Sequence, residues 1–224
     1  MKTILMRLQL SFICVIAAGI VSAQRVPTTD NLGLVGDRFK PLTYAEMTPA
    51  QKTMVDHLLA GERRGMGGPF NVLLRSPEMG DLAQQFGASM RFHSVLPRNV
   101  AETVIILTAR WWMAQFEWNA HKRAALQAGV SPAIVDAIAT GKRPAGMDPQ
   151  LEAAYNFITE LLKTRQVGDA TFQTAKDKFG ERGVVDMIGL SGWYTTVSMA
   201  LNVDRYPLGE GVQSELKPLA NPFP

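Results

Sequence analysis

One stretch constrains the fold more than any other. Residues 102–129, ETVIILTARWWMAQFEWNAHKRAALQAG, belong to the longest run of the chain without proline or internal glycine. Apolar residues recur in it every three or four positions, at Val104, Leu107, Trp111, Ala114, Trp118 and Ala125. This spacing is typical of a helix with a wide apolar stripe. We therefore expect the chain to be organised around a helix here.

Three groups able to transfer protons lie in this apolar surface: Glu102, Glu117 and His121. Glu117 and His121 are four residues apart and share one face of a continuous helix. Glu102 falls on nearly the same face, but a straight helix would separate it from Glu117 by about 22 Å. The three can serve one site only if the helix breaks or another subunit completes the site. We expect a break near Arg110–Ala114, where two adjacent tryptophans crowd the backbone.

The spacing of these groups resembles a known family. Glu102, fourteen residues, Glu117, three residues, His121 and then the AxxAG of Ala125–Gly129 are similar to the carboxymuconolactone decarboxylase-like family. Its alkyl hydroperoxidase D-type branch carries a CxxC pair whose positions correspond to Ala114 and Glu117, so the chain looks like the decarboxylase branch. The resemblance extends over about residues 69–202.

The positions of capping residues, prolines and glycines along the chain predict an all-α fold. Thr48-Pro49, Ser76-Pro77, Ser131-Pro132 and Asp148-Pro149 each place a capping side chain before a first-turn proline. We expect Asp169 to cap a further helix, and Gly61, Gly141, Gly168 and Gly180 to end helices. The expected helices are 49–60, 77–91, 99–128, 132–139, 149–166, 170–179 and 181–201. Residues 103–112 and 185–194 align weakly, so the fold contains either two related helical units or two helices alike by chance.

The ends of the chain predict export and simple domain boundaries. Residues 1–23 have a basic start, an apolar stretch and a Val21-Ser22-Ala23 cleavage site, as in a secretory signal peptide. The alternative is an uncleaved anchor. We expect an extended arm over 24–40, one helical domain over 41–206 and a proline-rich tail over 207–224. The mature protein would be periplasmic or secreted.

Charge and cysteine content exclude several classes of function. Of 23 basic residues the leader removes Lys2 and Arg7, which leaves a net charge of about +1 on the mature chain. We therefore expect neither nucleic-acid nor anionic-membrane binding. The only cysteine, Cys14, lies in the leader, so the mature chain has no thiol for redox chemistry.

The Glu117/His121 pair is the strongest candidate for chemistry. A carboxylate can fix the imidazole tautomer and raise its basicity, which suits a general acid or base near neutral pH. The alternative is a surface pair that stabilises a helix by about 0.2–0.5 kcal/mol. Glu102 alone is also compatible with a first-turn glutamate that stabilises a helix N-terminus. By the resemblance it would share a proton with His121, directly or through water.

The candidate substrate-binding residues are Arg110, Trp111, Phe116 and His93. The guanidinium of Arg110 would bind a substrate carboxylate, or instead pair with Glu117 or an acid on another helix. The spacing of the three histidines matches no metal-binding motif, and no cofactor fingerprint is present, so we expect neither a metal nor a cofactor.

Together these features predict an exported enzyme that resembles carboxymuconolactone decarboxylases and acts on a small cyclic or aromatic-derived carboxylic acid by acid/base chemistry. The catalytic residues would be Glu102, Glu117 and His121. One alternative is a peroxidase-branch antioxidant, which the lack of cysteine disfavours. The other is a non-catalytic module that binds a small ligand. The resemblance and the many aromatic residues also imply a homo-oligomer, a trimer or a multiple of it.

Overall fold

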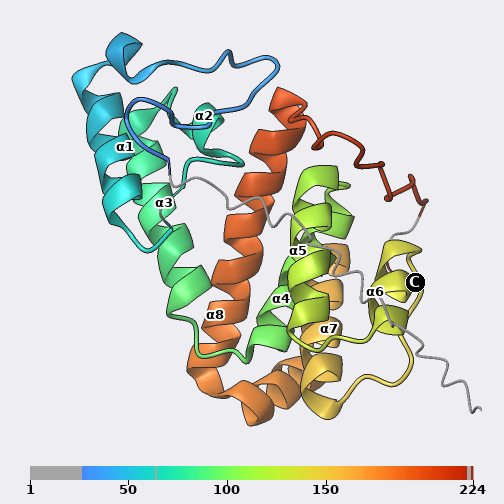
Figure 1. Ribbon diagram of the computed structural model, residues 1–224. Helices are drawn as coiled ribbons and strands as arrows, with labels where there is room; N and C mark the ends of the chain where they lie inside the picture. The colour runs from blue at the N-terminus through green and yellow to red at the C-terminus, as the bar shows by residue number, and fades with distance from the viewer. Residues whose placement is uncertain (1–26, 64, 221–222, 224) are drawn as a thin grey trace, which may run out of the picture.

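The computed structural model describes residues 27–63, 65–220 and 223. The proposed leader, residues 1–23, lies outside this part of the chain. The described residues form a single all-α domain (Figure 1). Its elements are a 3₁₀ turn Tyr44–Glu46 and helices α1 (Pro49–Ala60), α2 (Phe70–Leu73), α3 (Pro77–Phe92), α4 (Arg98–Trp111), α5 (Gln115–Gln127), α6 (Pro132–Ala139), α7 (Pro149–Thr164) and α8 (Asp169–Asp204).

Helix α4 lies at the centre of the packing. It contacts α5, α6, α7 and α8, while α2 and α3 pack on the opposite side of α8 and α1 packs on α3 (Figure 1). Every residue of α4 from Thr103 to Arg110 is buried. A helix that is apolar on nearly all sides must be covered on nearly all sides. The position of α4 follows from this pattern.

Side-chain caps fix where several helices begin. Thr48, Ser131 and Asp148 each accept a hydrogen bond from a backbone N–H of the first turn, and a proline follows each of them. Helices α1 and α6 have the expected bounds. Ser76 precedes α3 but makes no such capping bond.

Several helix boundaries differ from the expectation: α3 ends at Phe92, α8 extends to Asp204, and the junction of α7 with α8 is displaced. Helix α7 ends at Thr164 and is followed by Arg165 in the left-handed region, at φ 65°. Gly168 does not end α7 but is the N-cap of α8, so Asp169 is the first residue of that helix and not its cap. The 3₁₀ turn and the short α2 were not expected, because neither is long enough to show a period.

The long helix expected over 99–128 is broken. Helix α4 ends at Trp111, α5 starts at Gln115, and Met113 between them adopts a φ of 51°. The break falls within the 110–114 segment that the paired tryptophans indicated. It allows α5 to fold back against α4, so that the two helices lie side by side (Figure 1). Helix α8 is similarly interrupted at Gly180, whose φ of 67° suits a glycine.

The two ends of the described chain are held against the domain. In the arm, the backbone N–H groups of Asp37 and Phe39 both donate to Asp204 Oδ1 at the end of α8. In the tail, the Gln115 side chain accepts from the N–H groups of Glu215 and Leu216 and donates to the carbonyl of Leu216. The tail therefore covers the region where α4 and α5 meet.

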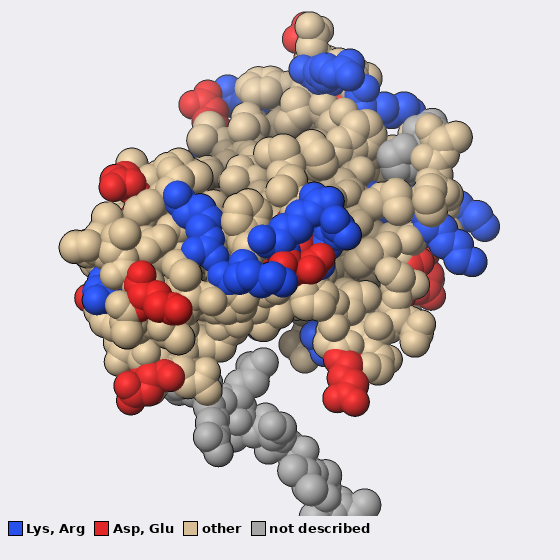
Figure 2. Space-filling view, turned by 90° about the horizontal axis from the view of Figure 1, so that it is seen from above, with Lys and Arg blue, Asp and Glu red and all other residues tan. Residues whose placement is uncertain are grey.

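The surface carries a mixed charge. Figure 2 shows a short row of basic side chains across the middle of one face, acidic groups beside it and toward the edges, and uncharged surface elsewhere. Among the helices of the described residues, none combines the length and the apolar character that crossing a bilayer requires.

The hydrogen bonds of Gln115 predict a contribution to stability. Gln115→Ala removes three hydrogen bonds to the tail and leaves partly buried backbone groups without partners. We expect the free energy of unfolding to fall by about 1–3 kcal/mol in urea denaturation. Gln127→Ala, an exposed position at the other end of α5, is the control. Equal stability of the two variants would contradict this role.

Candidate active site

His121 lies between two carboxylates, one at each ring nitrogen. Nδ1 is 2.6 Å from Glu102 Oε2, and Nε2 is 3.0 Å from Glu117 Oε1. Both nitrogens are therefore engaged at once. A ring in this position is fixed in orientation, because any rotation would break at least one of the two contacts.

The break between α4 and α5 produces this arrangement. Glu117 and His121 lie one turn apart on α5, while Glu102 comes from the N-terminal half of α4. On an unbroken helix Glu102 would be far from both. Folding α5 back against α4 brings Glu102 into direct contact with His121, with no second subunit required.

The three side chains are removed from solvent. Their exposed fractions are 5% for His121, 7% for Glu117 and 13% for Glu102. A surface helix pair would be solvated, so that alternative does not describe Glu117 and His121. Buried carboxylates and imidazoles must satisfy each other. Here each carboxylate accepts from the ring.

The electrostatics of the site favour the imidazolium. Burial by itself would lower the pKa of His121, but hydrogen bonds to Glu102 and Glu117 and their negative charges raise the pKa to about 9. The ring therefore carries a proton on both nitrogens at neutral pH. In that state His121 is a general acid, and it becomes a base only after it has given up a proton.

A cavity of about 150 Å³ adjoins this cluster. Among its lining residues are Glu117 and His121, the arginines Arg63 and Arg91, and the aromatic residues Phe70, Phe116, Trp193 and Tyr194. It thus combines a proton donor, cations and an apolar wall. These are the features of a small-ligand site.

Two aromatic residues of α8, Trp193 and Tyr194, form one wall of this cavity. Tyr194 lies edge-on to the His121 ring, with the ring centroids 4.8 Å apart. Its burial and the nearby Glu117 charge raise the pKa of its hydroxyl, which stays protonated. Trp193 packs against Gly87 of α3, where a Cβ would approach the indole to 2.3 Å. Glycine at position 87 thus allows Trp193 its position beside the cavity.

Not all of the candidate substrate-binding residues lie at the cavity. Phe116 lines the cavity, whereas Arg110 and Trp111 do not. Arg110 is buried and donates from Nη2 to the carbonyl of Lys217 at 2.9 Å. It forms no ion pair with any acid of the described chain. Trp111 stacks on Phe223 of the tail.

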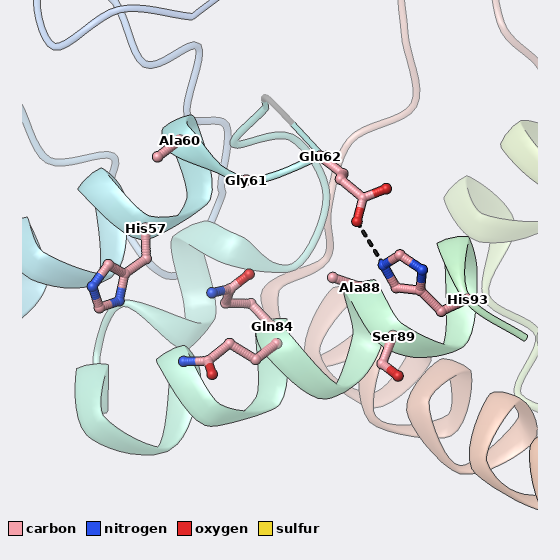
Figure 3. Close-up of a pocket in the computed structure, with 9 residues that line it drawn as sticks. His57, Ala60, Gly61, Glu62, Gln84, Ala88, Ser89 and His93 are labelled. Atoms are coloured by element: carbon pink, nitrogen blue, oxygen red, sulfur yellow. Dashed lines mark hydrogen bonds and ion pairs between the residues drawn. The ribbon is translucent and has the colours of Figure 1, made fainter.

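His93 lies outside the cavity as well. It is exposed and pairs with Glu62 at 2.6 Å, on the rim of a hollow of about 600 Å³ between α1 and α3 (Figure 3). His57 lies at the other end of this hollow and pairs with Asp81. Both histidines are exposed to solvent, and the buried polar side chain that lines the hollow, Gln84, already donates a hydrogen bond to Asp81. The larger hollow is therefore a weaker candidate for chemistry than the smaller cavity.

Arg63, Arg91 and Tyr194 are site residues that the sequence did not identify. Arg63 lies in the glycine-rich connection between α1 and α2, which reads as a flexible surface loop. In the sequence, Tyr194 is one of several aromatic residues on an apolar helix, and nothing local distinguishes it. The available signal in the sequence was Pro69-Phe70 at the end of this connection, which could cover a pocket. Among the described residues, no group of three or more His, Cys, Asp or Glu side chains is arranged to hold a metal ion.

The raised pKa of His121 predicts how stability depends on pH. Its contribution is fully present below the unfolded value of 6.5 and is lost as the pH rises through about 9. We expect the free energy of unfolding to fall by on the order of 2–3 kcal/mol over this interval in urea denaturation. His121→Gln should remove that part of the dependence. Parallel pH profiles for the two proteins would contradict the imidazolium assignment.

Comparison with known proteins gives no assignment. A scan against protein-family models finds no match for this chain. A search of curated proteins finds none either. The interpretation of the site therefore rests on its residues and their geometry.

Proposed function

We propose that this protein is a carboxymuconolactone decarboxylase-like enzyme that performs cofactor-free acid/base chemistry on a small cyclic or aromatic-derived carboxylic acid. The observation that carries the proposal is the His121 ring, held between the carboxylates of Glu102 and Glu117 beside a cavity of about 150 Å³. The spacing of these three residues, which resembles that family, supports it further.

The chemistry that suits this site is proton delivery to carbon. In a decarboxylation the bond to the carboxyl carbon breaks, carbon dioxide leaves, and its electron pair stays on the substrate. A proton must then form the new C–H bond. The Nε2 proton of His121 lies against Glu117, which lines the same cavity, so this pair can supply it. Solvent restores the proton after each turnover.

Glu102 acts through His121 and not on the substrate. It accepts the Nδ1 proton at 2.6 Å and does not line the cavity beside Glu117. A carboxylate in this position fixes the ring and stabilises the imidazolium. Glu102 is therefore a positioning residue in this mechanism.

The cavity limits the substrate to a small molecule. A volume of about 150 Å³ accommodates no more than a single ring with few substituents. Aromatic side chains form its apolar wall, and the two arginines favour a negative charge. The thiol mechanism of the peroxidase branch requires two cysteines, and this chain has Ala114 and Glu117 at those positions.

Export and assembly are further parts of the proposal. The signal-like residues 1–23 support a periplasmic or secreted location. A trimer or a multiple of it is supported by the resemblance and by large apolar side chains exposed on α3 and α8, including Leu82, Phe86, Val185 and Ile188. Three of the aromatic residues that suggested an interface, Trp118, Trp193 and Tyr194, are instead buried within the chain.

Light scattering tests the assembly. We expect the mature protein to elute as a trimer or a multiple of it at micromolar concentration, because exposed apolar helix faces favour association. Leu82→Glu combined with Ile188→Glu should shift it toward monomer. Gln127→Glu, on an exposed polar position, is the control. A wild-type protein that is monomeric at this concentration would contradict the proposal.

Substitution of the proton-transfer pair tests the mechanism. After a screen of small cyclic carboxylates has identified a substrate, His121→Ala and Glu117→Gln should each lower kcat by about 10²–10⁴-fold. The double variant should be hardly slower than the slower single variant, because the two residues act as a unit. Glu102→Gln should lower kcat with little change in KM.

His57→Ala provides the matched control, since it removes a histidine–carboxylate pair that lies in the other hollow. It should leave turnover unchanged. Wild-type rates for His121→Ala on a confirmed substrate would show that the mechanism is wrong.

A further inference from the structure

Buried hydrogen-bond donors without partners gather at the cavity beside His121. They are Nε and Nη2 of Arg63, Nε1 of Trp193 and the hydroxyl of Tyr194. None of the four has a hydrogen-bond partner among the described residues, and all three side chains line this one cavity. Buried polar groups are paired in the great majority of folded proteins. Their convergence on one small space therefore points to a ligand that pairs with them.

The chemistry of these donors defines the ligand. A guanidinium and an indole N–H can only donate, and a tyrosine hydroxyl can donate as well as accept. The ligand must present acceptors to them. Arg63 also forms no ion pair with any acid in the described part of the chain. A partly buried cation without a counter-ion is costly, so an anionic acceptor is favoured over a neutral one.

The geometry of Arg63 favours a planar anion. Nε and Nη2 lie on one edge of the guanidinium, and their N–H groups point in nearly parallel directions. A carboxylate meets this edge with both of its oxygens. The rings of Phe70, Phe92 and Trp193 surround the guanidinium at 5.2–5.9 Å and restrict its movement. The free edge is thus held in place before a ligand arrives.

We propose that Arg63, Trp193 and Tyr194 form a carboxylate-binding subsite that holds an anionic substrate next to the His121–Glu117 pair. Its role in turnover rests on the proposed function, whereas its ability to bind a carboxylate does not. The subsite takes the role that the sequence suggested for Arg110, which lies beneath the tail and does not line the cavity. Phe116 lines the same cavity and offers an apolar surface to the remainder of the ligand.

Equilibrium binding of simple carboxylates tests the subsite without any substrate. The probes are acetate, benzoate and benzamide, the last being a neutral molecule of nearly the same shape as benzoate. Isothermal titration calorimetry on the mature protein should show that at least one of the two carboxylates binds at millimolar concentration. Benzamide should bind at least about tenfold more weakly than benzoate, because it lacks the charge that Arg63 meets.

Variants then assign the binding to the subsite. Arg63→Gln should weaken binding of the carboxylate by about 10–100-fold and leave benzamide unchanged. Arg63→Lys keeps the charge but loses the two parallel N–H groups. Its affinity for the carboxylate should therefore lie between those of the wild type and Arg63→Gln. Tyr194→Phe should weaken binding by about three- to tenfold. Circular dichroism and urea denaturation establish that each variant is folded before it is titrated.

Two controls separate this proposal from the proposed function. Arg98→Gln removes an exposed arginine of α4 that does not line the cavity, and it should bind carboxylates as the wild type does. His121→Gln should lose turnover but keep carboxylate binding within a few-fold. If neither carboxylate binds, if benzamide binds as well as benzoate, or if folded Arg63→Gln binds like the wild type, the subsite proposal is overturned. Wild-type turnover by His121→Ala would overturn the mechanism alone.

Discussion

The candidate site depends on one interaction, the contact of the His121 ring with two carboxylates that the chain brings from opposite sides. Glu102 reaches Nδ1 and Glu117 reaches Nε2 in surroundings from which water is largely excluded. Each partner is unfavourable to bury alone. Together the two carboxylates keep the His121 ring protonated, and the contact between Glu102 and His121 connects α5 to α4. The same contact therefore serves the fold and the proposed chemistry.

That contact requires the break between α4 and α5, and the rest of the molecule supports the break. The tail is hydrogen-bonded to Gln115 at the first residue of α5, and Glu215 binds both Trp118 and Lys122 on the outward side of that helix. Helix α8 covers the inward side with Trp193 and Tyr194. Helix α5 is thus held from two directions, with Glu117 and His121 facing the interior.

The sequence predicted helix boundaries correctly where interactions within one turn of the chain determine them. Caps and first-turn prolines act within one turn of the chain, and the starts of α1, α6 and α7 follow from them. The break comes directly after the paired tryptophans, at Met113, which has a φ of 51°. Gly168 was misassigned because Arg165 takes the left-handed conformation that usually favours glycine. Local rules describe average preferences, and a tertiary contact can override them.

What the sequence by itself determined is the all-α fold and the pairing of Glu117 with His121, because helical periodicity and i,i+4 spacing can be read directly from the chain. Glu102 was a candidate mainly through the resemblance. Only the tertiary structure decided which cations and aromatic residues join these three groups. Arg63 enters the cavity from a loop, Arg110 turns toward the tail, and His93 remains in solvent. The direction of a side chain on a loop or at a helix end depends on what packs against it from distant parts of the chain. No local pattern carries that information, so the binding half of the site became visible only in the folded protein.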